Sequence, residues 1–317
     1  MNGDGSDDHP ASSSLQALGL GFFPSPEGTR LAYTTGQNRA TPSYGTVYTA
    51  SSDGSDQRAV WHFVGDPTGR LAWNPAGTKI AFSLAVYDPA SGQDGNPGLW
   101  VVNADGSDPH RVVADAIGNV AWSPDGKTLV YGAFQPSAFP STPSEDSLDL
   151  VSAAGGRPRR LTSWDNSPEG VPNLSWAPDG RTILVTSVHA SDDSLDSSAK
   201  IEAVSVPSGR TKVLFRDSPG VTYKSAVYSP DGSHIVVNEA VPGTTVEGTS
   251  VQRGNTLIVT RADGSHPMPL TRSVGYGSTL IGWVHAAPQL AHPPHPPPVV
   301  STTLPQVLVP ARGSVPA

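Results

Sequence analysis

The sequence predicts an all-β protein, a β-propeller made of four-stranded antiparallel blades. Three observations support this fold class: a turn motif that recurs along the chain, a second hairpin turn in each repeat, and many turn-forming residues. The 317 residues include 33 glycines and 32 prolines, and only 15% of the residues are charged. This composition is typical of many short strands joined by tight turns.

The first turn motif is an aromatic residue followed by a short segment with proline at its second turn position and glycine at its end. Proline presets φ, aspartate tolerates the next position, and glycine accepts the left-handed conformation, so an apolar run on each side makes a hairpin. We therefore interpret the recurrent aspartate as a turn former rather than a ligand. Successive aromatic residues are 49, 54, 52 and 55 residues apart. The copies are 73–77, 122–126, 176–180 and 228–232, with a degenerate first copy at 24–28 and a sixth that begins at 280–283.

A second hairpin turn follows inside every repeat. It is Asp-Gly at Asp53, Asp105 and Asp263, and other glycine-containing pairs replace it at 155–156 and 208–209. Each repeat therefore holds about four strands, which is one propeller blade. We refer to these strands as A, B, C and D in chain order.

Together, the two turns resemble the repeats of TolB-like propellers, a family with WD-like blades. The resemblance covers about residues 16–285. It implies a six-bladed ring and, in the TolB family itself, a bacterial envelope role beside a second small α/β domain. That second domain is absent from this sequence, which puts a Tol-Pal role in doubt.

The last blade is incomplete, because its A strand at 279–284 has no turn motif after it. Residues 14–18 are placed to lend a D strand, and a ring closed with five blades is the alternative. We expect a flexible acidic N-terminus over 1–13, the propeller over 14–287, and a disordered tail over 288–317. That tail contains nine prolines, a composition typical of extended polyproline structure.

The long connections should carry any binding site. In a propeller, the A–B and C–D turns share one edge of the blades, and the B–C and D–A connections share the other. Here the second set is long, at about 35–44, 86–97, 135–147, 189–199 and 241–254, and loops on a rigid scaffold often carry function. These connections hold 13 acidic and 3 basic residues. The candidate ligand-binding residues among them are Asp94, Glu145, Asp146, Asp192, Asp193 and Asp196.

A second candidate site lies at the mouth of the axial channel. Three residues before each aromatic, near the start of the A strand, the side chain is polar. These positions are Arg70, Asn119, Asn173 and Ser225. They could ring the axial opening, or they could complete loop hydrogen bonds. The aromatic residues themselves should be wedges between blades, with the small residues just before them allowing close packing.

Catalytic motifs are scarce. The chain has no cysteine, no Gly-x-Ser-x-Gly elbow, no His-Glu-x-x-His and no glycine-rich phosphate loop. Only His62, His189 and His285 could approach the loops as a metal site. We expect no cofactor, with calcium or another divalent cation held by the acidic loops as the alternative.

The net charge of −8 disfavours nucleic acid as a partner, and no stretch is long and apolar enough to span a membrane. The acidic N-terminus is not a secretory signal, so we expect a cytoplasmic protein, or a periplasmic one if a signal was removed. The leading hypothesis is a monomeric, non-enzymatic propeller that binds a protein, a peptide or an envelope component, possibly a cationic one, through its acidic loops. The alternatives are a lyase or hydrolase with an axial site, and a carbohydrate-binding or sensor module.

Overall fold

The computed structural model describes the central part of the chain. The described residues are 21–35, 44–67, 70–85, 98–114, 117–133, 147–164, 170–191, 194–218, 221–240, 245–246, 249–250 and 255–270. All of them belong to one compact unit, which spans residues 1–285. The predicted boundaries at 13–14 and 287–288 and the predicted sixth blade lie outside the described residues.

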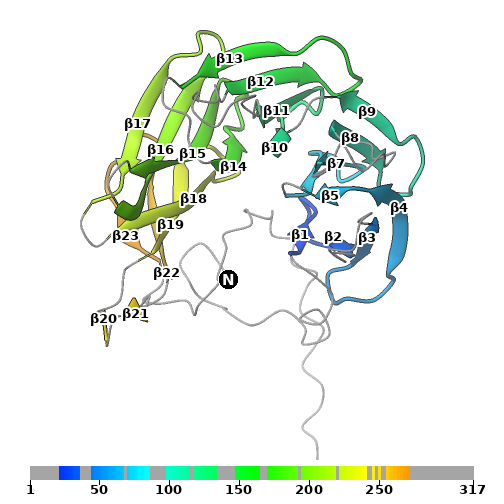
Figure 1. The fold of residues 1–317 in the computed structure, drawn as a ribbon, viewed down its shortest axis with the longest axis horizontal. Helices are drawn as coiled ribbons and strands as arrows, with labels where there is room; N and C mark the ends of the chain where they lie inside the picture. Colours follow the sequence, from blue (N-terminus) through cyan, green and yellow to red (C-terminus); the bar gives the residue numbers. More distant parts are fainter. Residues whose placement is uncertain are drawn as a thin grey trace, which may run out of the picture. The chain divides into compact units, whose positions relative to one another are not determined.

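Five antiparallel sheets follow one another in chain order (Figure 1). The first contains β1 (Phe23–Pro24), β2 (Arg30–Thr35), β3 (Tyr44–Ser51) and β4 (Arg58–Val64). The second contains β5 (Asp66–Pro67), β6 (Ala72–Trp73), β7 (Lys79–Ala85), β8 (Gly98–Asn103) and β9 (His110–Val113), and both β5 and β6 pair with β7. The A position of this sheet is therefore divided between two short strands.

The remaining three sheets repeat the same order. The third contains β10 (Ile117–Trp122), β11 (Thr128–Ala133), β12 (Ser147–Ser152) and β13 (Arg159–Ser163). The fourth contains β14 (Gly170–Trp176), β15 (Thr182–Ser191), β16 (Ser194–Ser205) and β17 (Thr211–Arg216). The fifth contains β18 (Thr222–Tyr228), β19 (His234–Ala240), β22 (Asn255–Arg261) and β23 (Met268–Pro269), while β20 (Thr245–Val246) and β21 (Thr249–Ser250) form a separate pair. The all-β, four-stranded blade prediction is confirmed.

The A–B turns adopt the predicted geometry. In each one the glycine N–H donates to the backbone carbonyl three residues earlier, as from Gly126 to Ser123 at 2.9 Å. Gly126 has φ of 68°, and its counterpart Gly180 has the same value. This left-handed conformation favours glycine, which explains why the motif ends in that residue.

The hydrophobic core lies between successive sheets. Four clusters of buried side chains each combine residues from two neighbouring sheets. Along β15, Ile183 and Val185 pack toward the third sheet, whereas Leu184 packs toward the fifth. Because alternate side chains of a strand point to opposite faces, both faces of these inner strands are covered, and their sequences are continuously apolar.

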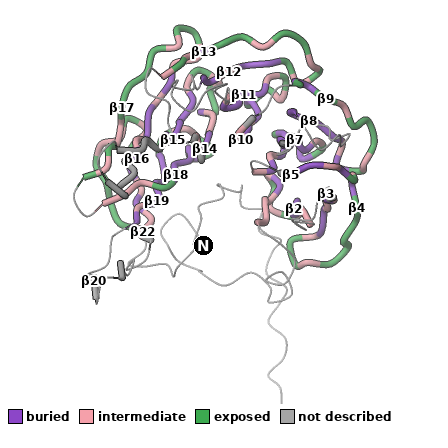
Figure 2. The backbone as a smooth tube through the Cα atoms, viewed as in Figure 1, coloured by how far each residue is buried: buried purple, intermediate pink, exposed green. Residues whose placement is uncertain are grey.

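Burial decreases from the middle strands of each sheet to the outermost strand (Figure 2). Strand β17 has no buried residue, whereas four of the six residues of β11 are buried. The outermost strands carry charged residues, such as Arg159 and Arg160 at the start of β13. Charged side chains on an edge strand discourage pairing with other chains.

One predicted loop is wrong. A long B–C connection was predicted at 189–199, but β15 and β16 continue through most of it and pair as far as Ser191 with Ser194. Residues 189–199 are mostly small, polar or acidic, a composition typical of a loop, but the cross-strand pairing of the preceding segments continues into this stretch. The fourth sheet thus extends beyond the end of β14, which pairs with β15 only as far as Val188.

Candidate functional site

The aromatic residues of the repeat join neighbouring sheets. The indole nitrogen of Trp122 donates to the carbonyl oxygen of Ala72 at 2.9 Å, and that of Trp176 donates to Ala121 at 3.3 Å. In each case the acceptor is the small residue that precedes the aromatic residue of the previous sheet. The prediction that the aromatic residues are wedges between blades is confirmed, and their N–H groups add a directional link.

The asparagines at the start of the A strands make further links between sheets. Asn119 accepts a hydrogen bond from the backbone N–H of Arg70 at 2.9 Å and donates one to the carbonyl oxygen of Val171 at 2.8 Å. Its side chain therefore connects the second, third and fourth sheets. Asn173 accepts from the backbone N–H of Ala226 at 3.3 Å. These two amides hold the A strands at fixed spacing.

A central cavity of about 350 Å³ is lined by the A strands of all five sheets and by their A–B turns. Three of the four predicted axial residues, Arg70, Asn119 and Asn173, line it. The sequence pattern had therefore located residues that the fold brings together around one space. Whether they bind a ligand stays a prediction.

Arg70 brings a positive charge to the central cavity. Its guanidinium carbon lies 5.8 Å from the centre of the Phe23 ring, in the range of a cation–π interaction. Burial lowers the pKa of Arg70 from its usual value, but an arginine keeps its charge at any physiological pH. The cavity therefore combines one cationic group with the amides of Asn119 and Asn173. Hydrogen bonds to neighbouring sheets already use part of the bonding capacity of these amides.

Ser225, the fourth predicted residue, is not part of the cavity wall. It is 3% exposed, and its hydroxyl oxygen has no hydrogen-bond partner among the described residues. Its strand pairs it with Asn238 of β19. Within the described part of the chain, Ser225 therefore makes no side-chain link between sheets of the kind that Asn119 and Asn173 make.

The prolines of the A–B turns were not predicted to line the cavity. They were assigned only to the turn, but all five line the central cavity. They are Pro26, Pro75, Pro124, Pro178 and Pro230. Their recurrence at one repeat position was the signal that could have found them, because equivalent positions of a propeller face the same axis.

The recurrent aspartates act as turn formers, as predicted. Asp125 accepts hydrogen bonds from the Ser123 hydroxyl at 2.6 Å and from the Lys127 backbone N–H at 3.1 Å. These bonds hold the pKa of the Asp125 carboxyl below its usual value. Asp179 likewise accepts from the backbone N–H of Arg181 at 2.9 Å. These carboxylates face their own turns.

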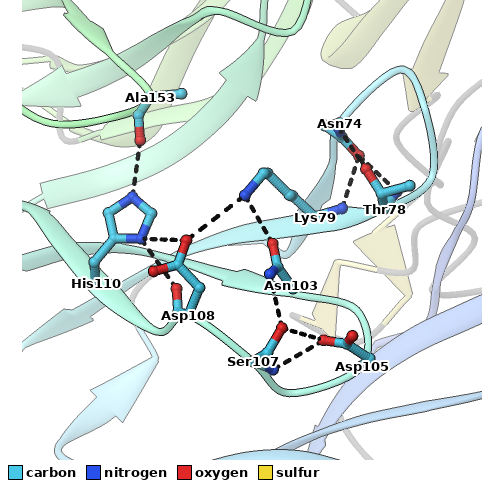
Figure 3. Close-up of polar contacts among 9 residues, drawn as sticks. All are labelled: Asn74, Thr78, Lys79, Asn103, Asp105, Ser107, Asp108, His110 and Ala153. Atoms are coloured by element: carbon cyan, nitrogen blue, oxygen red, sulfur yellow. Dashed lines mark hydrogen bonds and ion pairs between the residues drawn. The ribbon is translucent and has the colours of Figure 1, made fainter.

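A polar network connects the second and third sheets at the edge that carries these turns (Figure 3). Lys79 donates to the amide oxygen of Asn103 at 2.7 Å and forms an ion pair with Asp108 at 3.9 Å. The two ring nitrogens of His110 lie 3.0 Å from the carbonyl oxygens of Asp108 and Ala153. His110 thus connects β9 to the C–D turn of the next sheet.

The predicted acidic residues are not described at the level of side chains. Asp94, Glu145, Asp146, Asp192 and Asp193 lie outside the described residues, and for Asp196 only the backbone, within β16, is described. Of the three histidines considered for a metal site, only His62 has a described side chain, and it lies 2.8 Å from the Thr46 hydroxyl. Within the described ranges, no three His, Cys, Asp or Glu side chains could together hold a metal ion.

No helix in the described part of the chain has the length and apolar character needed to cross a membrane. No family model matches the sequence, and neither does any curated protein.

Solved structures do resemble this fold. A putative TolB from Agrobacterium tumefaciens is 18% identical over 79% of each chain, with a TM-score of 0.53. The hydrazine synthase of Kuenenia stuttgartiensis is 17% identical over 84% of this chain and 69% of that one, with a TM-score of 0.51. An oligogalacturonate lyase from Vibrio parahaemolyticus is 12% identical over 69% of this chain and 62% of that one, with a TM-score of 0.50. Because these proteins differ widely in kind and share less than a fifth of their residues with this chain, the likeness concerns architecture alone. Repeat motif, sheet topology and structural similarity together give this chain a TolB-like β-propeller fold.

Proposed function

We propose that this chain is a non-enzymatic binding propeller, which recognises a cationic segment of a protein or peptide through the acidic connections at one edge of its sheets. We refer to the edge with the B–C and D–A connections as the loop edge, and to the edge with the A–B and C–D turns as the turn edge. The sequence places 13 acidic and 3 basic residues in the loop-edge connections.

The observation that carries this proposal is the register of the strands. In the first sheet, Thr35 at the end of β2 pairs with Thr46, while Arg30 at its start pairs with Ser51 next to the C–D turn. The other sheets share this arrangement, so every B–C connection leaves from the same edge. Acidic connections that share one edge produce a negative potential, which attracts cations and speeds their association.

The sheets that carry the loop edge are well suited to support a binding surface. Asn119 and Trp122 of β10 both hydrogen-bond to neighbouring sheets, which fixes the position of this inner strand. A rigid frame lowers the entropy cost of presenting loops to a partner. Strands β15 and β16 pair as far as Ser191 with Ser194, and in the sequence Asp192 and Asp193 lie between these two residues.

The test is titration of a fluorescein-labelled oligolysine peptide. Replacing Asp192, Asp193 and Asp196 with asparagine should weaken binding about tenfold, since each exposed ion pair contributes up to about 1 kcal/mol. Binding should also weaken as salt is raised. The matched control removes three acidic charges from the turn edge, through Glu27→Gln, Asp56→Asn and Asp108→Asn, and should retain wild-type affinity. Equal affinities for the two triple variants would overturn the proposal.

A further inference from the structure

A groove of about 770 Å³ lies between the third and fourth sheets at the turn edge. Strand β12, the C–D connection that follows it, and the A–B turns of both sheets line this groove. It shares Pro124, Trp176 and Pro178 with the central cavity, but its charged residues, which come from turns and an outer strand, do not line that cavity. We refer to it as the 3–4 groove.

Two arginines give the 3–4 groove its charge. Arg157 and Arg159 both line it, and both are exposed. Among the described residues, neither side chain forms a hydrogen bond or an ion pair. Their neighbour Arg160, by contrast, lies 3.9 Å from Asp149. Both guanidinium groups are thus exposed at the groove and unpaired within the part of the chain that the structure describes.

The carboxylates on the other side do not cancel this charge. Asp125 and Asp179 line the groove, but each accepts a hydrogen bond from the backbone of its own turn. A basic residue, Lys127 or Arg181, follows each of them by two positions. The turns are thus balanced in charge, and the excess of positive charge at the groove comes from Arg157 and Arg159.

The groove also has an apolar part. Trp176, which is half-buried, lines it together with Pro178 and Val206 of the fourth sheet. An inorganic anion would use the arginines and leave this apolar surface unused. A chain that carries both carboxylates and apolar side chains would use both features, because aromatic and arginine side chains are the residues most enriched in the centres of protein interfaces.

We propose that the 3–4 groove binds an acidic peptide segment of a partner protein. Carboxylates of the peptide pair with the guanidinium groups of Arg157 and Arg159, for which arginine offers a planar, bidentate geometry. An apolar side chain of the same segment packs against Trp176 and Pro178. This surface is at the turn edge and does not depend on the loop-edge function proposed above.

The test uses a fluorescein-labelled peptide of alternating glutamate and leucine, titrated by fluorescence anisotropy. The salt concentration is about 0.15 M, where the screening length is about 8 Å and the overall negative charge of the chain repels the probe less. The variant is Arg157→Glu with Arg159→Glu. The matched control is Arg58→Glu with Arg210→Glu, which changes the charge equally at exposed positions outside the groove. Circular dichroism checks that both variants are folded, and Arg157→Gln with Arg159→Gln replaces the first variant if it is not.

Wild type and the control should bind this peptide with equal affinity, and the groove variant should bind at least about tenfold more weakly. A peptide of alternating lysine and leucine should not bind the groove, and free glutarate should not displace the acidic peptide at similar concentrations. Equal affinity of the groove variant and the control, or no binding to wild type, would overturn the proposal. Displacement by glutarate would assign the groove to small carboxylates and would also overturn it.

Discussion

The indole nitrogen of Trp122 lies 2.9 Å from the carbonyl oxygen of Ala72, which is 50 residues earlier in the chain. The same relation joins Trp73 to the carbonyl oxygen of Phe23, also at 2.9 Å. One residue type at one repeat position therefore packs between two sheets and hydrogen-bonds across them. The sheets are joined by directional bonds as well as by apolar contact, which fixes their spacing.

Removing this donor should destabilise the protein. Trp122→Phe keeps most of the apolar ring but leaves the Ala72 carbonyl without its partner, which should cost about 1–3 kcal/mol. Urea denaturation measures the loss. Trp61→Phe is the control, since Trp61 is partly buried against a core cluster, while Trp122 is buried, and the indole nitrogen of Trp61 bonds to no described group. Equal losses in the two variants would show that ring volume, rather than the hydrogen bond, accounts for the effect.

The side chain of Asn119 should contribute more to the free energy of unfolding than an exposed side-chain amide does. Asn119→Ala removes the bonds to Arg70 and Val171 together, and we expect a loss of about 2–4 kcal/mol in the free energy of unfolding. Gln57→Ala removes an amide that bonds at the surface, to Tyr33 and Gly54, and should cost less than about 1 kcal/mol. Similar losses from both substitutions in thermal and urea unfolding would contradict the proposed role of Asn119.

A comparison of two glycines distinguishes the stability cost of a left-handed backbone from the cost of a steric clash. Gly126 and Gly209 have nearly the same φ, 68° and 67°. A Cβ at Gly126 would lie 3.7 Å from Pro75, whereas one at Gly209 would collide with the carbonyl oxygen of Leu161 in the previous sheet. Gly126→Ala should therefore cost about 1 kcal/mol for the left-handed backbone, and Gly209→Ala should cost clearly more. Equal costs in urea denaturation would show that the two sheets can separate freely at Gly209.

Acid should weaken the A–B turn of the fifth sheet. The hydroxyl groups of Ser229 and Ser233 donate to Asp231 and, with the backbone N–H of Ser233, hold the pKa of its carboxyl well below the usual 3.8. The folded state then binds fewer protons than the unfolded state, so this contribution to stability is present above pH 3.8 and is lost as pH falls through the folded pKa.

Asp231→Asn should accordingly lose less stability than wild type when the pH is lowered from neutral to about 3. Thermal melts across this range give the comparison. High salt should leave the difference in place, because hydrogen bonds rather than distant charges cause most of the pKa shift. A variant that loses as much stability as wild type would show that the turn does not couple to protonation.

Sequence reasoning succeeded where a repeat position has one physical role. The turn glycines, the turn aspartates and the aromatic wedges followed from local chemistry alone, and the structure places them as expected. Arg70, Asn119 and Asn173 were found because equivalent positions of a repeat face the same axis. Their hydrogen bonds to neighbouring sheets could not be predicted, since these depend on how far apart two A strands lie.

Other features depended on non-local information. The length of the β15–β16 hairpin was underestimated, because residues 189–199 are mostly small and polar, and the pairing that extends the hairpin into them is not visible in the sequence. The 3–4 groove was not predicted, because no motif in the sequence marks Arg157 and Arg159 as part of a site. Their position beside Trp176 is created by the packing of two sheets, which is not visible in the chain order.

Two peptides and two variants test the whole account together. The loop-edge variant, in which Asp192, Asp193 and Asp196 become asparagine, should lose affinity for oligolysine and keep its affinity for the peptide of alternating glutamate and leucine. The groove variant, in which Arg157 and Arg159 become glutamate, should show the reverse. Anisotropy titration of wild type and both variants with both peptides is therefore the most direct measurement. This selective loss is the predicted result, and loss of both affinities, or of neither, in each variant would contradict the claim that the propeller binds partners at its two edges.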